Sequence, residues 1–172
     1  MLLKPYHGLT PKIDGAYVAE DVSLIGDVEL GENSSIWYGV VLRGDVDKIK
    51  IGKNTSIQDN SVAHCATGYP TIIGDNCVVG HNAIIHSCTV EDECLIGMGA
   101  VLLDGCKIGR GSIIAAGSVV SPNKVIPPNS MVMGVPGRVV RELTEKDREG
   151  TVKSVAHYIA YAEAQFEKTY ME

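Results

Sequence analysis

An internal repeat with a period of six residues dominates this chain. Between positions 90 and 132 every sixth residue is a branched aliphatic, a spacing that fits neither an α-helix nor an ordinary strand. Most of these aliphatics follow a small residue that stands two places earlier. The six-residue unit predicts one wall of a parallel β-helix, whose bore the aliphatic side chains fill. The repeated aliphatics are Val90, Ile96, Leu102, Ile108, Ile114, Val120, Ile126 and Val132.

The same pattern extends toward the N-terminus, with two insertions at residues 43–50 and 67–70. We expect a lead-in segment at residues 1–17, a β-helix over residues 18–137 and a C-terminal helical segment over residues 138–172 that packs on the coil. Apolar residues at steps of three and four predict a helix from about Lys153 to Tyr170. Thr144 and Asp147 form a helix-capping signal ahead of it. The earlier repeat positions are Val18, Leu24, Leu30, Ile36, Leu42, Ile51, Ile57, Ala63, Ile73, Val79 and Ile85.

Charge and composition exclude several classes of protein. The net charge of −6 and the absence of a basic cluster argue against a nucleic-acid partner. The sequence has no apolar stretch of membrane-spanning length and no signal-peptide pattern, so we expect a cytoplasmic protein without membrane contact. The five cysteines form no C-x-x-C pair and are expected to be reduced core residues.

Counting three units for each turn of the coil shows which polar residues share a wall. His64 and His86 fall one turn apart on the same wall, and Arg43 falls one turn before them. Stacked strands lie about 4.8 Å apart, close enough for two imidazoles to share one metal ion. His81 and Gln58 fall on a different wall. His81 can then join the pair across an interface between subunits, so the geometry predicts an oligomer.

Three histidines in consistent register match a catalytic zinc site, which has three protein ligands and keeps one position open for water. The candidate ligands are His64, His81 and His86. Three neutral imidazoles make Zn²⁺ the default ion, although Fe²⁺ or Co²⁺ would satisfy the same ligands.

Three segments, taken with the hexapeptides, resemble the γ-class carbonic anhydrases. They are RGD at 43–45, SIQDNSVAH at 56–64 and GHNAIIH at 80–86. The spacing of the three histidines is specific, and the resemblance covers nearly the whole chain. It implies an all-β solenoid, a left-handed parallel β-helix, that assembles as a homotrimer with a metal at each of three subunit interfaces. Two histidines would come from one subunit and the middle one from its neighbour.

The resemblance also implies an activity and a role for each matching residue. The activity is the reversible hydration of CO2 to bicarbonate by a metal-bound hydroxide. His64, His81 and His86 would be the metal ligands, and Arg43 and Asp45 would form a pair between subunits. Gln58 would orient the metal-bound water, and Tyr158 is the candidate for a tyrosine that the family places near the site on the C-terminal helix.

The sequence departs from the family pattern at three positions. Val46 replaces a glutamate that follows the arginine-x-aspartate motif, and Ser56 replaces an asparagine. The segment Cys65 to Gly68 (CATG) has no acid where the family carries a proton-shuttling glutamate. Without these acids we expect slow turnover or a different route for protons.

Two other functions remain open from the sequence. A hexapeptide acyltransferase that uses acyl-CoA would share the coil and often has a segment like Gly134-Val135-Pro136. Such enzymes use one histidine as a general base instead of three clustered ligands. The missing shuttle acids also leave open a non-catalytic metal-binding or scaffold protein.

Overall fold

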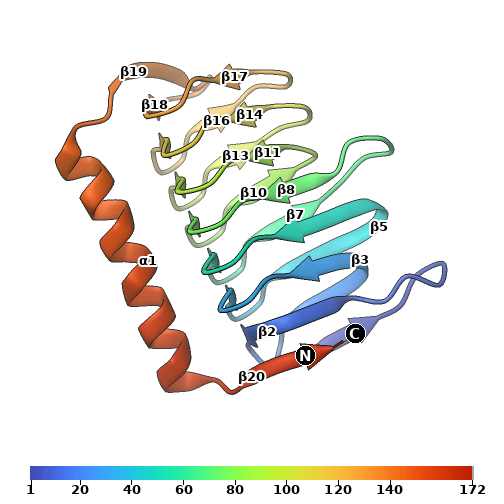
Figure 1. Ribbon diagram of the computed structural model, residues 1–172. Coiled ribbons are helices and arrows are strands. Elements are labelled where there is room, and N and C mark those ends of the chain that lie inside the picture. Colours follow the sequence, from blue (N-terminus) through green and yellow to red (C-terminus); the bar gives the residue numbers. More distant parts are fainter. Residues whose placement is uncertain (172) are drawn as a thin grey trace.

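A computed structural model describes residues 1–171 and shows a coil of stacked short strands with one helix beside it (Figure 1). The coil is a parallel-strand solenoid of about seven turns. Equivalent strands of successive turns pair in parallel, and their register repeats from turn to turn. The predicted fold class, a parallel β-helix with a C-terminal helix, is confirmed.

Three walls enclose the bore of the coil, and β3 and β5 are long enough to run from the first wall into the second. The first wall is built from β1 (Leu2–Lys4), β3 (Ser23–Leu30), β5 (Val41–Ile51), β7 (Val62–His64), β10 (Ile84–His86), β13 (Val101–Leu102) and β16 (Val119–Val120). The second continues from β3 and β5 into β8 (Thr71–Ile73), β11 (Thr89–Val90), β14 (Lys107–Ile108) and β17 (Val125–Ile126). The third comprises β2 (Lys12–Val18), β4 (Ser35–Ile36), β6 (Ser56–Ile57), β9 (Val78–Val79), β12 (Leu95–Ile96), β15 (Ile113–Ile114) and β18 (Ser130–Met133).

The repeated aliphatics form one buried column behind each wall, which is the core of the protein. On the second wall, for example, Ile73 stacks between Ile51 and Val90, and all three are buried. Glycine is required where one turn approaches the next. A Cβ on Gly97 would lie 2.4 Å from the backbone nitrogen of Ala116. The five cysteines are buried and free, as predicted.

The coil begins earlier than the predicted boundary at residue 18. Strand β1 pairs with β3 on the first wall, and β2 pairs with both β3 and β4. The predicted lead-in over residues 1–17 is therefore wrong, because most of these residues already belong to the coil. The six-residue period misses them because Leu3 and Ile13, which stack on Leu24 and Leu30, are not spaced by multiples of six.

The C-terminal segment contains two strands in addition to the predicted helix. Strand β19 (Arg138–Glu142) pairs antiparallel with β18, and β20 (Lys168–Met171) pairs antiparallel with β2. Between them α1 (Glu145–Gln165) runs back along the coil and packs against β4, β6 and β9 of the third wall (Figure 1).

The capping signal is confirmed, because Thr144 and Asp147 form a reciprocal capping box. The helix starts directly after this cap, earlier than the predicted Lys153. It ends before Tyr170 because the last described residues extend into the sheet. Within residues 1–171, α1 lacks the apolar length that crossing a membrane requires.

Candidate metal centre

Three polar residues stack on the first wall, each one turn from the next. Arg43 on β5 aligns with His64 on β7, and His64 aligns with His86 on β10. The prediction that these residues share a wall is therefore confirmed. Each directly follows a buried residue of its strand, so its side chain points away from the bore.

The two imidazoles face each other, and each turns its other nitrogen toward a carboxylate. Nδ1 of His64 lies 3.1 Å from Nε2 of His86. Nε2 of His64 lies 3.1 Å from Oδ1 of Asp45. Nδ1 of His86 contacts Oδ1 of Asp104. An ionised carboxylate only accepts hydrogen bonds, so a ring that bonds its aspartate does so through an N–H group.

This arrangement suits a cation. In the tautomers that donate to the two aspartates, His64 and His86 present two unprotonated nitrogens to each other across 3.1 Å. Two lone pairs at that distance repel unless a positive charge lies between them. Two nitrogens bound to one tetrahedral Zn²⁺ at about 2.0–2.1 Å would be about 3.3 Å apart. The pair therefore fits two of the three predicted ligands.

His81 lies at the opposite edge of the first wall, at the turn that follows β9. The turn at residues 81–82 and the strand β10 separate it from His86. Its Nδ1 lies 2.8 Å from Oδ2 of Asp59, and its backbone N–H donates to Oε1 of Gln58. Within residues 1–171 of the single chain, no three His, Cys, Asp or Glu side chains form a metal-binding group.

Gln58 is buried one turn before Gly80, next to His81, whereas the residue in register with His81 is Asp59. Because its amide oxygen accepts the backbone N–H of His81, the carboxamide has a fixed orientation. Its NH2 group is the part that is left to donate to another molecule.

Arg43 and Asp45 pair with each other in the same chain. Nη1 of Arg43 lies 2.7 Å from Oδ2 of Asp45, whose other oxygen contacts His64. Burial acts to raise the pKa of Asp45, but the hydrogen bonds from Arg43 and His64 outweigh it and the pKa is lowered. The resemblance predicted a pair between subunits, whereas the structure shows one within the chain that holds Asp45 against His64.

Tyr158 of α1 lies on the His81 side of the coil. Its ring packs edge-on against Trp37, with the ring centroids 5.9 Å apart. Burial raises the pKa of the Tyr158 hydroxyl, and the nearby carboxylate of Asp59 raises it further. Because Asp59 pairs with His81, the predicted tyrosine is near one of the candidate ligands and on the opposite edge of the first wall from the other two.

The sequence reasoning missed two aspartates, Asp59 and Asp104. Asp59 could have been found by register, because the alignment of Ile57 with Val79 places it one turn from His81. Asp104 gives no such signal. It lies outside every motif, and it reaches His86 from the turn between β13 and β14.

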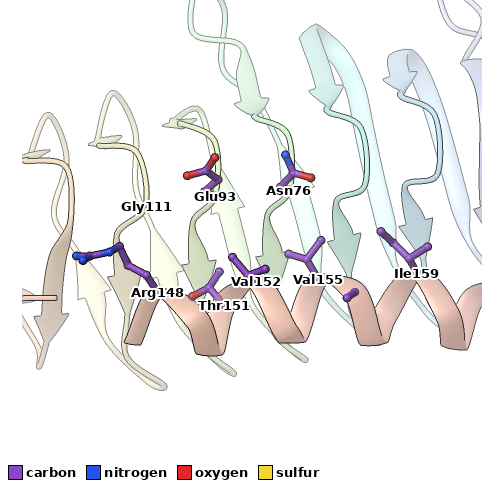
Figure 2. A pocket seen from close by; sticks show the side chains of 9 residues that line it. Asn76, Glu93, Gly111, Arg148, Thr151, Val152, Val155 and Ile159 are labelled. Carbon is purple, nitrogen blue, oxygen red and sulfur yellow. The ribbon is translucent and has the colours of Figure 1, made fainter. Parts of the chain in front are cut away.

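A groove of about 280 Å³ lies away from these histidines, between α1 and the turns of the coil (Figure 2). Val152, Val155 and Ile159 line its helix side, and Asn76 and Glu93 line the coil side. The Thr151 hydroxyl is buried there without a hydrogen-bond partner in the described part of the chain. None of the predicted site residues contributes to the lining.

Comparison with known proteins identifies the family. Residues 87–122 match the family model "Bacterial transferase hexapeptide (six repeats)", which describes the repeat. A probable carbonic anhydrase of Methanocaldococcus jannaschii is 52% identical over 146 residues, which are 85% of this chain and 92% of that protein. Gamma carbonic anhydrase 1, mitochondrial, of Arabidopsis thaliana is 47% identical over 87% of this chain and 56% of its own length. The chain belongs to the γ-class carbonic anhydrase family.

Solved structures agree with this fold. A hexapeptide transferase family protein from Anaplasma phagocytophilum superposes with a TM-score of 0.93. It is 40% identical and covers 96% of this chain and 98% of its own. Hexapeptide transferases therefore have the same coil, and the γ-class assignment depends on the higher sequence identity to the carbonic anhydrases.

Proposed function

We propose that this protein is a metal-dependent carbonic anhydrase that interconverts CO2 and bicarbonate. The observation that carries the proposal is the pair of imidazole nitrogens of His64 and His86 that face each other, 3.1 Å apart, in a chain 52% identical to a probable carbonic anhydrase. A scaffold does not require two imidazole nitrogens that face each other at this distance. An acyltransferase base would need one such nitrogen, without a second imidazole opposite it.

The third ligand in this proposal is His81 of a neighbouring subunit in a homotrimer. A cyclic interface joins two different surfaces, so the His81 edge of one subunit can meet the His64 and His86 edge of the next. An aliphatic row on the outer face of the first wall supports a protein partner there. Val62 and Ile84, its central members, are 38% and 44% exposed. The row consists of Val41, Val62, Ile84, Val101 and Val119.

The residues around the histidines have separate tasks in this proposal. When bound, the cation supplies the Lewis acidity that ionises water near neutral pH. Asp45 holds the His64 ring, and Arg43 holds Asp45. Gln58 donates from its amide NH2 and orients the reacting water or bicarbonate. Tyr158 closes the His81 side of the site.

Zn²⁺ is the proposed ion, with Fe²⁺ or Co²⁺ as the alternatives that fit three imidazoles. The test is metal analysis of anaerobically purified protein, combined with a CO2 hydration assay on the same sample. We expect one metal ion for each chain and hydration activity that a chelator removes and the metal restores. His64→Ala is the negative control and should lose both.

The same two measurements separate the rival functions. Full metal content without hydration in any buffer would favour a non-catalytic metal-binding protein. Metal-free protein with acyl transfer from acyl-CoA would favour the hexapeptide acyltransferase. Either result would contradict the proposed activity.

The proposal also predicts how protons leave the site. Val46 is an exposed apolar residue of β5, and the CATG segment after His64 brings no carboxylate. Proton export is therefore expected to limit turnover, and a small diffusible buffer such as imidazole should raise the rate in proportion to its concentration. Stopped-flow hydration assays across a buffer series measure this dependence.

The substitution Thr67→Glu supplies a carboxylate on the loop that follows His64. It is expected to raise the rate at low buffer concentration and to have little effect at high concentration. Thr67→Gln introduces a side chain of the same size as glutamate but without the charge, and it should leave the rate unchanged. If neither the buffer concentration nor Thr67→Glu changes the rate, protons leave by another route.

A further inference from the structure

Asp104 is a conspicuous polar residue that the family motifs leave unassigned. It lies on the turn between β13 and β14, one turn of the coil from His86, and its side chain is about half exposed. Its neighbours fix the backbone of this turn. The N–H of Gly105 donates to the carbonyl of Ser87, and the carbonyl of Asp104 accepts from Asn123. These hydrogen bonds hold the backbone of Asp104 in place, and its carboxylate contacts Nδ1 of His86.

The contact decides which nitrogen of His86 carries the proton. A second group, the hydroxyl of Ser87, lies 3.2 Å from the same Nδ1 atom. A hydroxyl can donate or accept and so does not select a tautomer, whereas a carboxylate only accepts. Asp104 thus requires the proton on Nδ1 and leaves the Nε2 lone pair of His86 directed at His64.

We propose that Asp104 is a positioning residue that holds His86 in the tautomer and ring orientation needed to bind the metal. The inference rests on the proposed metal site and extends it beyond the motif residues. The other two histidines have equivalent partners, because Asp45 contacts His64 and Asp59 contacts His81. A carboxylate behind a ligating imidazole fixes the ring and raises the basicity of the ligand. Asp104 completes this set for His86.

The test uses the full-length protein and the isosteric change Asp104→Asn. An amide can donate as well as accept, so it no longer selects the Nδ1–H form. We expect ¹⁵N NMR of metal-free protein to show the Nδ1–H tautomer of His86 in the wild type and a mixture in the variant. We also expect the affinity for Zn²⁺, measured by chelator competition, to fall by about 10–100-fold, as is usual for such partners. Asp104→Glu, which keeps the carboxylate, should recover part of both properties.

Asp92→Asn is the matched control. Asp92 also lies on a turn of the coil, but its carboxylate accepts the backbone N–H of Asp75 and contacts no histidine. The control removes the same charge and should leave the His86 tautomer and the Zn²⁺ affinity unchanged.

The outcomes separate this inference from the proposed function. Wild-type tautomer and affinity in Asp104→Asn, with Zn²⁺ bound to the wild type, would overturn the role of Asp104 and leave the metal site standing. Equal losses in Asp104→Asn and Asp92→Asn would also overturn it, because a general charge effect would then explain both. A wild-type protein that binds no Zn²⁺ would overturn the metal site and this inference together.

Discussion

Mixing His64→Ala subunits with His81→Ala subunits is expected to restore about one quarter of the wild-type metal sites, although each variant alone has none. In a cyclic trimer every site takes His64 and His86 from one subunit and His81 from the next. A mixed trimer therefore contains one interface with all three ligands, and about three quarters of randomly assembled trimers are mixed. Metal content and CO2 hydration of the co-expressed trimers, without selection, measure this recovery; trimers selected through two different tags are all mixed and should retain about one third of the sites.

A second mixture provides the control for this experiment. His64→Ala and His86→Ala affect ligands that stack on the same wall of the same chain. No interface in their mixed trimers regains both residues, so neither metal nor activity should return. Recovery in this control, or no recovery with His64→Ala and His81→Ala in proven mixed trimers, would contradict the interfacial site. Stoichiometric metal in an isolated monomer would contradict it as well.

The substitution Ile73→Ala is expected to lower the free energy of unfolding by about 2–5 kcal/mol, the usual cost of a large-to-small change in a core. Ile73 is 1% exposed and stacks between Ile51 and Val90 in the column behind the second wall. Its loss leaves a cavity that the neighbouring turns cannot fill, because backbone hydrogen bonds fix their spacing. Chemical denaturation followed by circular dichroism measures the change.

Ile72→Ala is the matched control for this effect. The residue is identical and adjacent in β8, but its side chain is half-buried and lies between Lys50 and Thr89 on the outer face. Its replacement is expected to cost only about 0.5 kcal/mol, as is typical of surface changes. Equal costs for the two variants would show that the second-wall column is not the main source of stability in this region. Both positions are on the second wall, away from the proposed interface.

The six-residue period by itself determined most of the coil. In a stacked coil the register between turns follows from residue counts, so counting units correctly placed Arg43, His64 and His86 in one row. The same count predicted His81 and Gln58 one turn apart on another wall, whereas the structure places His81 in the turn before β10, in register with Asp59. Local signals also sufficed for the helix cap, because Thr144 and Asp147 interact within one helical turn.

The tertiary structure decided what the period does not encode. Strands β1 and β20 join the coil through pairing with β3 and β2, and residues distant in sequence stabilise each of these pairs. Sequence patterns give no such signal when the partner lies outside the repeat.

The fine geometry of the candidate site also required the fold. Repeat counting gives the position of a Cα along a wall, but a side chain on a turn can extend in several directions. Asp104 illustrates this, since its contact with His86 depends on the path of the turn at Gly105. Thus the sequence alone determined which residues share a wall. Packing between turns decided which imidazole nitrogens face each other, because hydrogen bonds to Asp45 and Asp104 orient both rings.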